Sequence, residues 1–370
     1  MKVALVYDRV NKWGGAERVL LALHKIFPKA PLYTSVYNSK KAPWAKVFKI
    51  KTSFLQSLPK AKASHEYYAT FMPHAFEGFS FDDYDLVISV TSEAAKGIIT
   101  GPKTLHICYC LTPTRYIWSG YDEYFKNTTL RILSKPFVNY LKRWDIKASK
   151  RPDHMISISK EVKARVKKYY GRETEIIYPP LDSGLLNIEK KKKTQKKTKL
   201  KEEDYFLIVS RLVPYKKIEI AIKACNELKL NLKIIGIGSF EKELKKLAGG
   251  TIEFLGELTD RELSYYYENC KALIFPGIEE FGLVMVEAQS FGKPVIAYKK
   301  GGALDILKEG VTGTFFTKQN VSSLKKVLKS FNNKRYNSLL LRNNAKRFSF
   351  NIFEKELKKF IKKSLKNKIK

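Results

Sequence analysis

The stretch KVALVYDRVNKWGGAERVLLALHKIF, residues 2–27, decides the fold of this chain. Its first six residues have the short apolar pattern of a buried strand, and residues 16–27 repeat apolar side chains at helical spacing. Between them lies a polar loop that contains Asp8, Gly14 and Gly15. A strand, a glycine-containing loop and an amphipathic helix are the opening of a doubly wound α/β domain.

The alternation of strand and helix continues along the chain. In the first half we expect strands at 85–90, 104–109, 154–157 and 175–178, and a helix at 160–170. After a Lys-rich run the alternation restarts at Tyr205 and continues to Arg347, with strands at 205–210, 232–238, 252–256, 272–276 and 294–298 and helices at 218–228, 240–248, 261–270, 282–292 and 303–310. The pattern therefore predicts two α/β domains.

The 370 residues suit two domains of about 150–200 residues each. We expect an N-terminal domain at 1–186, a Lys-rich linker or surface insertion at 187–204, and a C-terminal domain at 205–347. The tail at 348–370 is expected to be a helix. Its apolar stripe consists of Phe353, Leu357, Phe360, Ile361 and Leu365.

The charge is unusual, with 70 Lys and Arg residues against 36 Asp and Glu residues and a formal net charge of +34. Such an excess attracts polyanions: nucleic acid, an anionic membrane face or phosphorylated small molecules. A solvated, lysine-rich surface is the alternative. No apolar run approaches the roughly 20 residues that span a bilayer, and the N-terminus turns polar too soon for a signal peptide. We therefore expect a cytoplasmic protein.

The sequence contains no pattern typical of a metal site. Cys108, Cys110, Cys225 and Cys270 lack a second Cys or His pair at metal spacing, so they are expected to be reduced, buried thiols. The segment 83–85 (DYD) has the form of an Asp-x-Asp metal motif, but it directly precedes a strand, which favours a turn with a strand cap.

The strongest constellation of polar residues is PGIEEFGLVMVEA at 276–288. Glu279 lies in the loop after a strand, and Glu287 lies in the second turn of the following helix. Gly282 leaves the N–H groups at the start of that helix open to a phosphate. A carboxylate farther along can accept hydrogen bonds from ribose hydroxyls. An acidic helix cap is the alternative interpretation.

A basic pair follows the strand at 205–210. Arg211 offers a planar fork of donors and Lys216 a point charge, and both suit a diphosphate. In so lysine-rich a chain a basic pair alone means little. Its place at the carboxyl end of a strand, where such sheets bind ligands, favours a functional interpretation.

Together these segments resemble the family-4 retaining glycosyltransferases of the GT-B fold, also called glycosyl transferases group 1, and within them a mannosyltransferase-like branch. The resemblance covers nearly the whole chain. The residues that carry it are Gly14–Glu17, Cys108–Trp118, Ile177–Asp182, Arg211, Lys216, Glu279, Phe281, Gly282, Leu283, Glu287, Gly292–Ala297, Gly301 and Gly302.

The resemblance implies two Rossmann-like domains that face each other across a donor-binding cleft, with the last helix packing back across both. Arg211 and Lys216 would neutralise the donor diphosphate, together with backbone N–H groups. Those N–H groups would come from Gly14, Gly15, Phe281, Gly282 and Leu283. Glu287 would hold the ribose, and Glu279 would contact the sugar ring near the anomeric carbon. Gly238 would line the base and diphosphate side.

One position departs from the family pattern. Relatives often show His between Cys110 and Thr112, where this chain has Leu111. The role of that histidine could pass to His106, or Leu111 could alter donor preference or slow the enzyme. Arg115, in the same segment, is a further candidate on the acceptor or donor-sugar side.

The resemblance thus implies a retaining hexosyltransferase without metal or cofactor. It would move mannose from GDP-mannose, favoured over UDP-sugars, to a glycan or lipid-linked glycan in cell-surface polysaccharide or glycolipid synthesis. A catalytically silent relative acting as a partner subunit is one alternative, for which Leu111 is the hint. A nucleic-acid-binding protein is another, suggested by the charge and 21 tyrosines. It leaves the donor-site spacing unexplained, so no nucleic acid is expected.

The sequence also contains a candidate membrane-binding segment. Residues 40–62 mix lysines with Trp44, Phe48, Phe54 and Leu55, as an interfacial segment would. An ordinary exposed loop and helix is the alternative. Lysines are attracted to an anionic lipid surface, so this segment predicts peripheral binding at the inner membrane face.

Overall fold

A computed structural model of the chain describes residues 1–125, 127–181 and 204–368, which fall into two compact units. Unit 1 consists of Met1–Tyr178 and Phe353–Lys370, and unit 2 of Pro179–Ile352. The expected linker at 187–204 lies outside the described residues except for Asp204. The domain boundaries expected from the sequence remain predictions.

Unit 1 is built on a seven-stranded parallel sheet in the order β3-β2-β1-β4-β5-β6-β7. The strands are β1 (Val3–Tyr7), β2 (Leu32–Thr34), β3 (Ile50–Thr52), β4 (Leu86–Thr91), β5 (Leu105–Cys110), β6 (His154–Ser157) and β7 (Glu175–Ile176). Every residue of β4 and β5 is buried, because helices cover both faces of a parallel sheet. All the strands predicted in this half are confirmed, although β7 ends two residues early.

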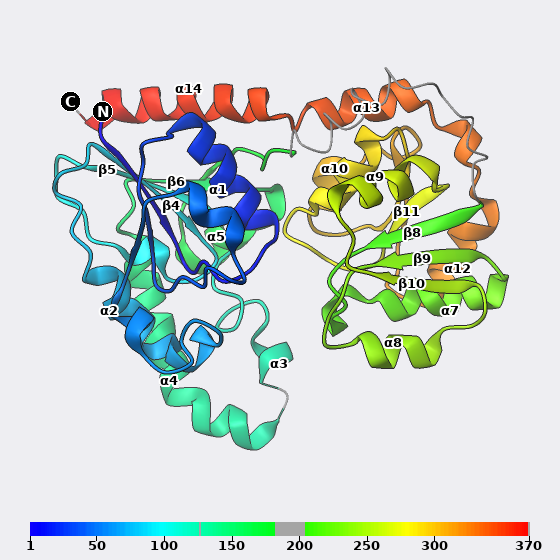
Figure 1. Ribbon diagram of the computed structural model, residues 1–370, viewed down its shortest axis with the longest axis horizontal. Coiled ribbons are helices and arrows are strands. Elements are labelled where there is room, and N and C mark those ends of the chain that lie inside the picture. The colour runs from blue at the N-terminus through cyan, green and yellow to red at the C-terminus, as the bar shows by residue number, and fades with distance from the viewer. Residues whose placement is uncertain (126, 182–203, 369–370) are drawn as a thin grey trace. The chain divides into compact units, whose positions relative to one another are not determined.

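The helices of unit 1 include a long one that the sequence analysis did not predict, α4. They are α1 (Gly15–Ile26), α2 (Met72–Glu77), α3 (Tyr121–Tyr124), α4 (Thr128–Ser149), α5 (Lys160–Tyr170) and most of α14 (Phe350–Lys368). The predicted stripe of α14 is buried except for Leu365, which is half-buried, and its Phe353 and Phe360 rings contact Tyr109 of β5 and His154 of β6. The last helix of the chain therefore packs on the unit 1 sheet (Figure 1).

Unit 2 has a six-stranded parallel sheet in the order β10-β9-β8-β11-β12-β13. The strands are β8 (Tyr205–Val209), β9 (Asn231–Ile235), β10 (Ile252–Gly256), β11 (Ala272–Phe275), β12 (Val295–Tyr298) and β13 (Gly313–Phe316). The helices are α7 (Ile218–Leu228), α8 (Glu241–Leu247), α9 (Asp260–Asn269), α10 (Leu283–Ser290), α11 (Ala303–Ile306), α12 (Val321–Ser330) and α13 (Ser338–Lys346).

Helices cover both faces of this second sheet, with α7 and α8 on one face and α10 and α13 on the other (Figure 1). The strands and helices expected from the alternating pattern are confirmed within a few residues. The exception is the helix expected at 303–310, which ends at Ile306 because Leu307 is extended. The sequence analysis did not predict β13, α12 or α13.

The segment at 40–62 differs from the expected interfacial segment. Phe48 and Leu55 are buried, and the Trp44 indole is half-buried and donates a hydrogen bond of 2.8 Å to the Lys12 carbonyl. Of the four apolar side chains singled out, Phe54 alone is exposed. The segment therefore packs on unit 1 and is a poor candidate for the membrane contact.

Candidate functional site

The strand order of unit 2 creates a topological switch point between β8 and β11, the position at which open parallel sheets have a crevice. From β8 the chain moves outward through β9 and β10, then returns to β11 on the other side of β8. The loops that follow β8 and β11 therefore leave the sheet in opposite directions. In open parallel sheets ligands bind at this switch point, outside the carboxyl ends of the strands. The predicted residues 211–216 and 279–282 lie on these two loops, and Leu283 begins α10.

Lys216 and Glu279 meet across this switch point. Lys216 ends a short 3₁₀ helix, Pro214–Lys216, and its ammonium forms an ion pair with Oε1 of Glu279. The Lys216 side chain is 9% exposed and that of Glu279 is 24% exposed. The Lys216 Nζ also lies 5.0 Å from the centre of the Tyr215 ring. The cation is thus held in place, while the carboxylate keeps access to solvent.

Arg211 lies on the same loop and is exposed. Its Nη2 donates a hydrogen bond of 2.7 Å to the Tyr215 hydroxyl. Tyr215 therefore contacts both predicted diphosphate-binding cations, a role that the sequence analysis did not assign to it.

Close backbone packing fixes Glu279. A Cβ at Gly277 would lie 2.9 Å from the Lys216 carbonyl oxygen, and one at Gly302 would lie 2.2 Å from the carbonyl oxygen of Phe281. The Gly302 N–H donates to the Glu279 carbonyl at 2.9 Å. Glycine lets the loops after β8, β11 and β12 press backbone against backbone, and this contact orients the carboxylate.

Close backbone packing also explains the glycine at position 238. It follows β9, and a Cβ at this position would lie 2.2 Å from the Leu212 carbonyl oxygen. The Leu212 N–H in turn donates to the Ile237 carbonyl at 3.0 Å. The loop after β9 is thereby joined to the loop that carries Arg211.

The N-terminus of α10 lies beside Glu279. Gly282 begins this helix with a φ of +92°, a left-handed conformation that favours glycine, and no side chain caps the helix at this residue. Phe281 is buried and Leu283 is half-buried. N–H groups at a helix N-terminus bind anions. Their predicted contact with the donor phosphate remains a prediction.

Glu287, on α10, is 1% exposed and accepts a hydrogen bond of 2.7 Å from the Tyr267 hydroxyl at its Oε2. Tyr267 lies on α9 and is fully buried. The sequence analysis missed it because three tyrosines, 265–267, follow one another. A buried tyrosine needs a partner for its hydroxyl, and this requirement was the available signal. The ribose contact of Glu287 remains a prediction.

The remaining predicted residues belong to unit 1. Gly14 and Gly15 lie at the start of α1, after β1. A Cβ at Gly14 would lie 3.1 Å from Oε2 of Glu17, a buried carboxylate that accepts a hydrogen bond of 2.7 Å from the Tyr7 hydroxyl. Burial and then Glu17 raise the pKa of Tyr7. Gly14 thus makes room for a carboxylate of this chain.

The expectation for His106 is wrong. This residue lies near the start of β5, away from the carboxyl edge of the sheet, and is fully buried. Its Nε2 lies 2.8 Å from the Ser89 hydroxyl, and burial lowers its pKa to about 3. A neutral imidazole inside the sheet cannot contact a sugar. Arg115 is half-buried in the loop after β5, and its role remains a prediction.

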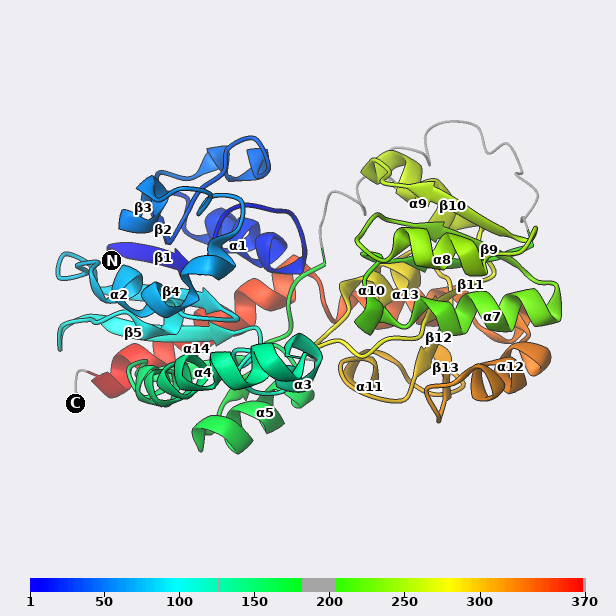
Figure 2. The ribbon, with the colours of Figure 1, turned by 90° about the horizontal axis from the view of Figure 1, so that it is seen from below.

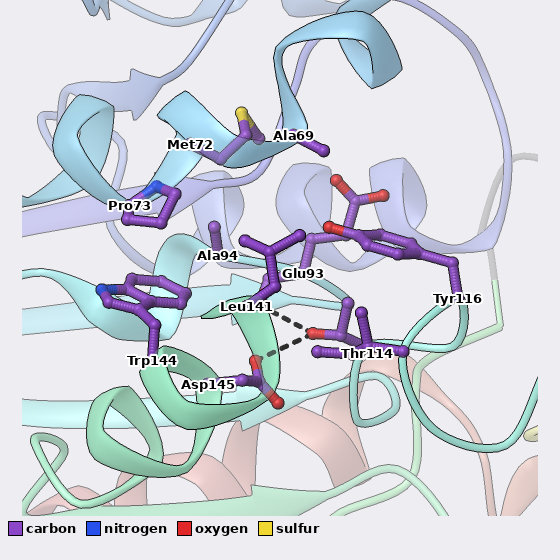
Figure 3. A pocket seen from close by; sticks show the side chains of 11 residues that line it. Ala69, Met72, Pro73, Glu93, Ala94, Thr114, Tyr116, Leu141, Trp144 and Asp145 are labelled. Atoms are coloured by element: carbon purple, nitrogen blue, oxygen red, sulfur yellow. Dashed lines mark hydrogen bonds between the residues drawn. The ribbon is translucent and has the colours of Figure 1, made fainter. Parts of the chain in front are cut away.

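A small cavity in unit 1 lies near this loop (Figure 3). Its volume of about 10 Å³ suits about one water molecule. Thr114 Oγ1 donates a hydrogen bond of 3.0 Å to the buried carboxylate of Asp145. Asp145 also accepts hydrogen bonds of 2.7 Å from Trp118 and Tyr170, and pairs with Lys96 at 2.5 Å. These groups satisfy one another, so the cavity is not a sugar site.

Within the described residues, no three His, Cys, Asp or Glu side chains gather as metal ligands would. The expected strand cap at 83–85 is confirmed, because Asp85 accepts a hydrogen bond of 2.6 Å from the Lys2 N–H just before β4. All four cysteines are buried thiols, as expected.

The loop after β1 shows a contact that the sequence analysis did not predict. Asp8 is fully buried and accepts hydrogen bonds of 2.7–3.1 Å from the backbone N–H groups of the loop after β4. These donors are Ser92, Glu93, Ala94 and Ala95. Arg9 forms an ion pair of 2.5 Å with Glu93. Burial alone would raise the pKa of Glu93, but Arg9 and then His65 hold it at about 2.

Glycosyltransferases are among the curated proteins to which this chain is similar. The chain is 29% identical over 208 residues to an uncharacterised glycosyltransferase of Methanocaldococcus jannaschii, covering 55% of this chain and 56% of that protein. It is 28% identical over 193 residues to the alpha-1,3/1,6-mannosyltransferase ALG2 of Saccharomyces cerevisiae, covering 40% of this chain and 38% of that protein. The matches thus span about half or less of these relatives.

Solved structures match over nearly the whole chain. Anabaena HepE in complex with UDP-glucose has a TM-score of 0.70 at 20% identity, covering 98% of this chain and 100% of that one. Sucrose-phosphate synthase from Thermosynechococcus elongatus has a TM-score of 0.70 at 14% identity, covering 98% and 99%. At these identities the likeness establishes the fold.

The family model "Glycosyl transferases group 1" matches residues 189–348, the stretch that carries Arg211, Lys216, Glu279 and Glu287. The expected fold is confirmed by the two parallel α/β units and by the structural matches. Residues 189–348 therefore belong to the glycosyl transferases group 1, and the chain as a whole has the GT-B fold.

Proposed function

We propose that this protein is a retaining glycosyltransferase that moves a hexose from a nucleotide-sugar to a glycan or lipid-linked glycan in cell-surface polysaccharide or glycolipid synthesis. The observation that carries the proposal is the ion pair of Lys216 and Glu279 at the switch point of unit 2. It places a cation suited to a diphosphate beside a carboxylate suited to a sugar hydroxyl.

The chemistry requires little beyond this arrangement. A glycosyl phosphate departs through an oxocarbenium-like state, so fixed positive charge on the leaving diphosphate lowers the barrier. Lys216 carries three N–H donors and can keep one on Glu279 while it binds a phosphate oxygen with another. Arg211 adds a second charge from the same loop. Retention would follow from attack on the front face, with the leaving phosphate accepting the acceptor's proton.

Mannose from GDP-mannose is the proposed donor. The similarity to mannosyltransferases, ALG2 among them, supports the sugar. HepE is bound to UDP-glucose, so a uridine nucleotide is the alternative donor nucleotide. A thermal-shift panel of GDP, UDP and ADP tests the nucleotide, because a ligand at 100 times its Kd adds roughly 2.7 kcal/mol of stability. A shift with UDP alone would overturn the choice of GDP.

We also propose that transfer needs no metal, since Arg211 and Lys216 can offset the diphosphate charge in place of magnesium. Activity that disappears with a chelator and returns with magnesium or manganese would contradict this.

The test of the proposed function is Glu279→Gln. Transfer from GDP-mannose should be abolished, while GDP affinity, measured by calorimetry, should fall far less than in Glu287→Ala. The control is Glu253→Gln, an exposed carboxylate on β10, which should leave both unchanged. Equal losses of GDP binding in Glu279→Gln and Glu287→Ala would contradict the assigned roles.

Leu111 favours one second candidate, a catalytically silent relative that acts as a partner subunit. Purified protein that binds nucleotide but neither hydrolyses nor transfers the sugar would support that alternative.

A further inference from the structure

Helix α4 of unit 1 has an unusual charge distribution. Between Thr128 and Ser149 it carries five basic residues and a single acidic one, Asp145. Asp145 is buried and fully engaged with Lys96, Trp118 and Tyr170. The solvent side of the helix therefore presents positive charge without a compensating carboxylate of its own.

The same helix exposes a regular apolar stripe. Leu133, Phe137 and Tyr140 are 65%, 59% and 42% exposed. They stand at positions i, i+4 and i+7, so they share one face of the helix. A neighbouring face of the helix supplies the packing contact, because Val138 and Leu141 are buried in a cluster with Ile117. Apolar side chains thus occur on two faces of α4, and the contacts of unit 1 account for one.

Two exposed cations continue the stripe. Arg143 and Lys147 follow Tyr140 at i+3 and i+7, so they extend the same face toward the C-terminal end of the helix. We call Leu133, Phe137, Tyr140, Arg143 and Lys147 the outer stripe. Figures 1 and 2 show α4 at the margin of unit 1, away from the sheet.

We propose that the outer stripe of α4 docks unit 1 on the surface of an anionic lipid bilayer. Exposed apolar side chains together with exposed cations on one helix are the composition of interfacial helices, which lie in the plane of the membrane. A second copy of this chain is a poorer occupant, because the outer stripe contains no carboxylate that could pair with Arg143 and Lys147 of another copy. The mode of binding is peripheral: among the described residues no helix is long and apolar enough to cross a bilayer.

The experiment is sedimentation of the full chain with vesicles of phosphatidylcholine alone and of phosphatidylcholine with phosphatidylglycerol, at low and high salt. The wild-type chain should bind the anionic vesicles at low salt and release them at high salt. Leu133→Ser/Phe137→Ser/Tyr140→Ser should weaken this binding at least tenfold. Arg143→Ser/Lys147→Ser should weaken it severalfold and reduce its salt dependence.

Matched controls come from unit 2. Leu339→Ser/Leu340→Ser removes exposed apolar side chains from α13, and Lys334→Ser/Arg335→Ser removes exposed cations nearby. Both should sediment with anionic vesicles as the wild-type chain does. Nucleotide affinity, measured on all variants, should stay unchanged, so that a failure of this proposal is distinct from a failure of the proposed enzyme activity.

Three outcomes would overturn the proposal. One is a wild-type chain that ignores anionic vesicles at low salt. Another is a stripe variant that binds them as tightly as its controls. The third is a wild-type dimer in sedimentation velocity that both stripe variants abolish, which would assign the stripe to a second copy of the chain.

Discussion

The two units have the same arrangement at the switch point of the sheet but use it differently. In unit 1 the loops after β1 and β4 are joined by Asp8, which is fully buried and bonded to four backbone N–H groups of its own chain. In unit 2 the loops after β8 and β11 are joined by Lys216 and Glu279, and the carboxylate is 24% exposed. Both pairs of loops are held together by a carboxylate.

The difference is in what each carboxylate has left to offer. Asp8 has its acceptor capacity taken up by the chain, so it joins the two loops to each other. Glu279 pairs with the Lys216 ammonium, which is flexible and has further donors, and the carboxylate keeps contact with solvent. The same topology thus serves packing in one unit and, as we propose, ligand binding in the other. Fold alone does not locate function, whereas the hydrogen bonds of each crevice do.

The largest effect is expected for Asp8→Ala. Four buried N–H groups would lose their acceptor, and each unsatisfied buried group costs about 1–3 kcal/mol. Partial hydration would reduce the sum, so we expect the free energy of unfolding of unit 1 to fall by about 3–5 kcal/mol. Urea unfolding followed by tryptophan fluorescence measures it. Asp83→Ala, an exposed site, should change it by less than about 0.5 kcal/mol. Similar values for both variants would contradict a structural role for Asp8.

The second prediction tests the other crevice. Lys216→Ala should weaken GDP binding by roughly 10–100-fold, since a charge-assisted hydrogen bond contributes about 1.5–3 kcal/mol. Unfolding should change little, because the Glu279 carboxylate left behind can be hydrated. Calorimetry measures the affinity, with Lys223→Ala on an exposed face of α7 as the control. A large loss of stability with intact GDP binding would mean that both crevices are structural.

Sequence reasoning works where a pattern repeats or a residue type has few uses. The buried strands of both sheets follow from their apolar runs, and Lys216 and Glu279 follow from their places after two strands. The outer stripe of α4 was missed because apolar residues occur on two of its faces, which blurs the helical period. Phe48 and Leu55 were expected to be exposed because their segment folds into 3₁₀ turns without any period.

Partners that are distant in sequence are a second limit. Asp8 lies more than 80 residues from the N–H groups that it binds, and Tyr267 lies 20 residues from Glu287. Neither spacing matches a local motif. His106 was considered near the sugar because it lies close in sequence to Leu111, but it stands near the amino end of β5, five positions before the ligand-binding edge of the sheet.

The third prediction concerns that histidine. Burial holds the pKa of His106 near 3, below the unfolded value of about 6.5. The imidazole therefore binds a proton in the unfolded chain that it does not bind in the folded chain. The free energy of unfolding falls as the pH drops from 6.5 toward 3. Between pH 7.5 and 5 this contributes a loss of about 2 kcal/mol. In His106→Gln the pH dependence of urea unfolding should flatten by that amount. His74→Gln, at an exposed site, should keep the wild-type slope, and an unchanged slope in both would refute the assignment.

The smallest expected effect is that of Tyr267→Phe, which tests whether the buried part of the unit 2 crevice also serves a ligand. The change removes one hydrogen bond to Glu287 and should cost about 1 kcal/mol of stability. If Tyr267 aims the carboxylate at a ribose, wild-type protein should bind GDP more tightly than 2′,3′-dideoxy-GDP, and the variant should lose much of that preference. Tyr266→Phe, at the half-buried neighbour, should retain it. A preference that survives in Tyr267→Phe, despite the loss of stability, would make this hydrogen bond structural, as the bonds of Asp8 are in unit 1.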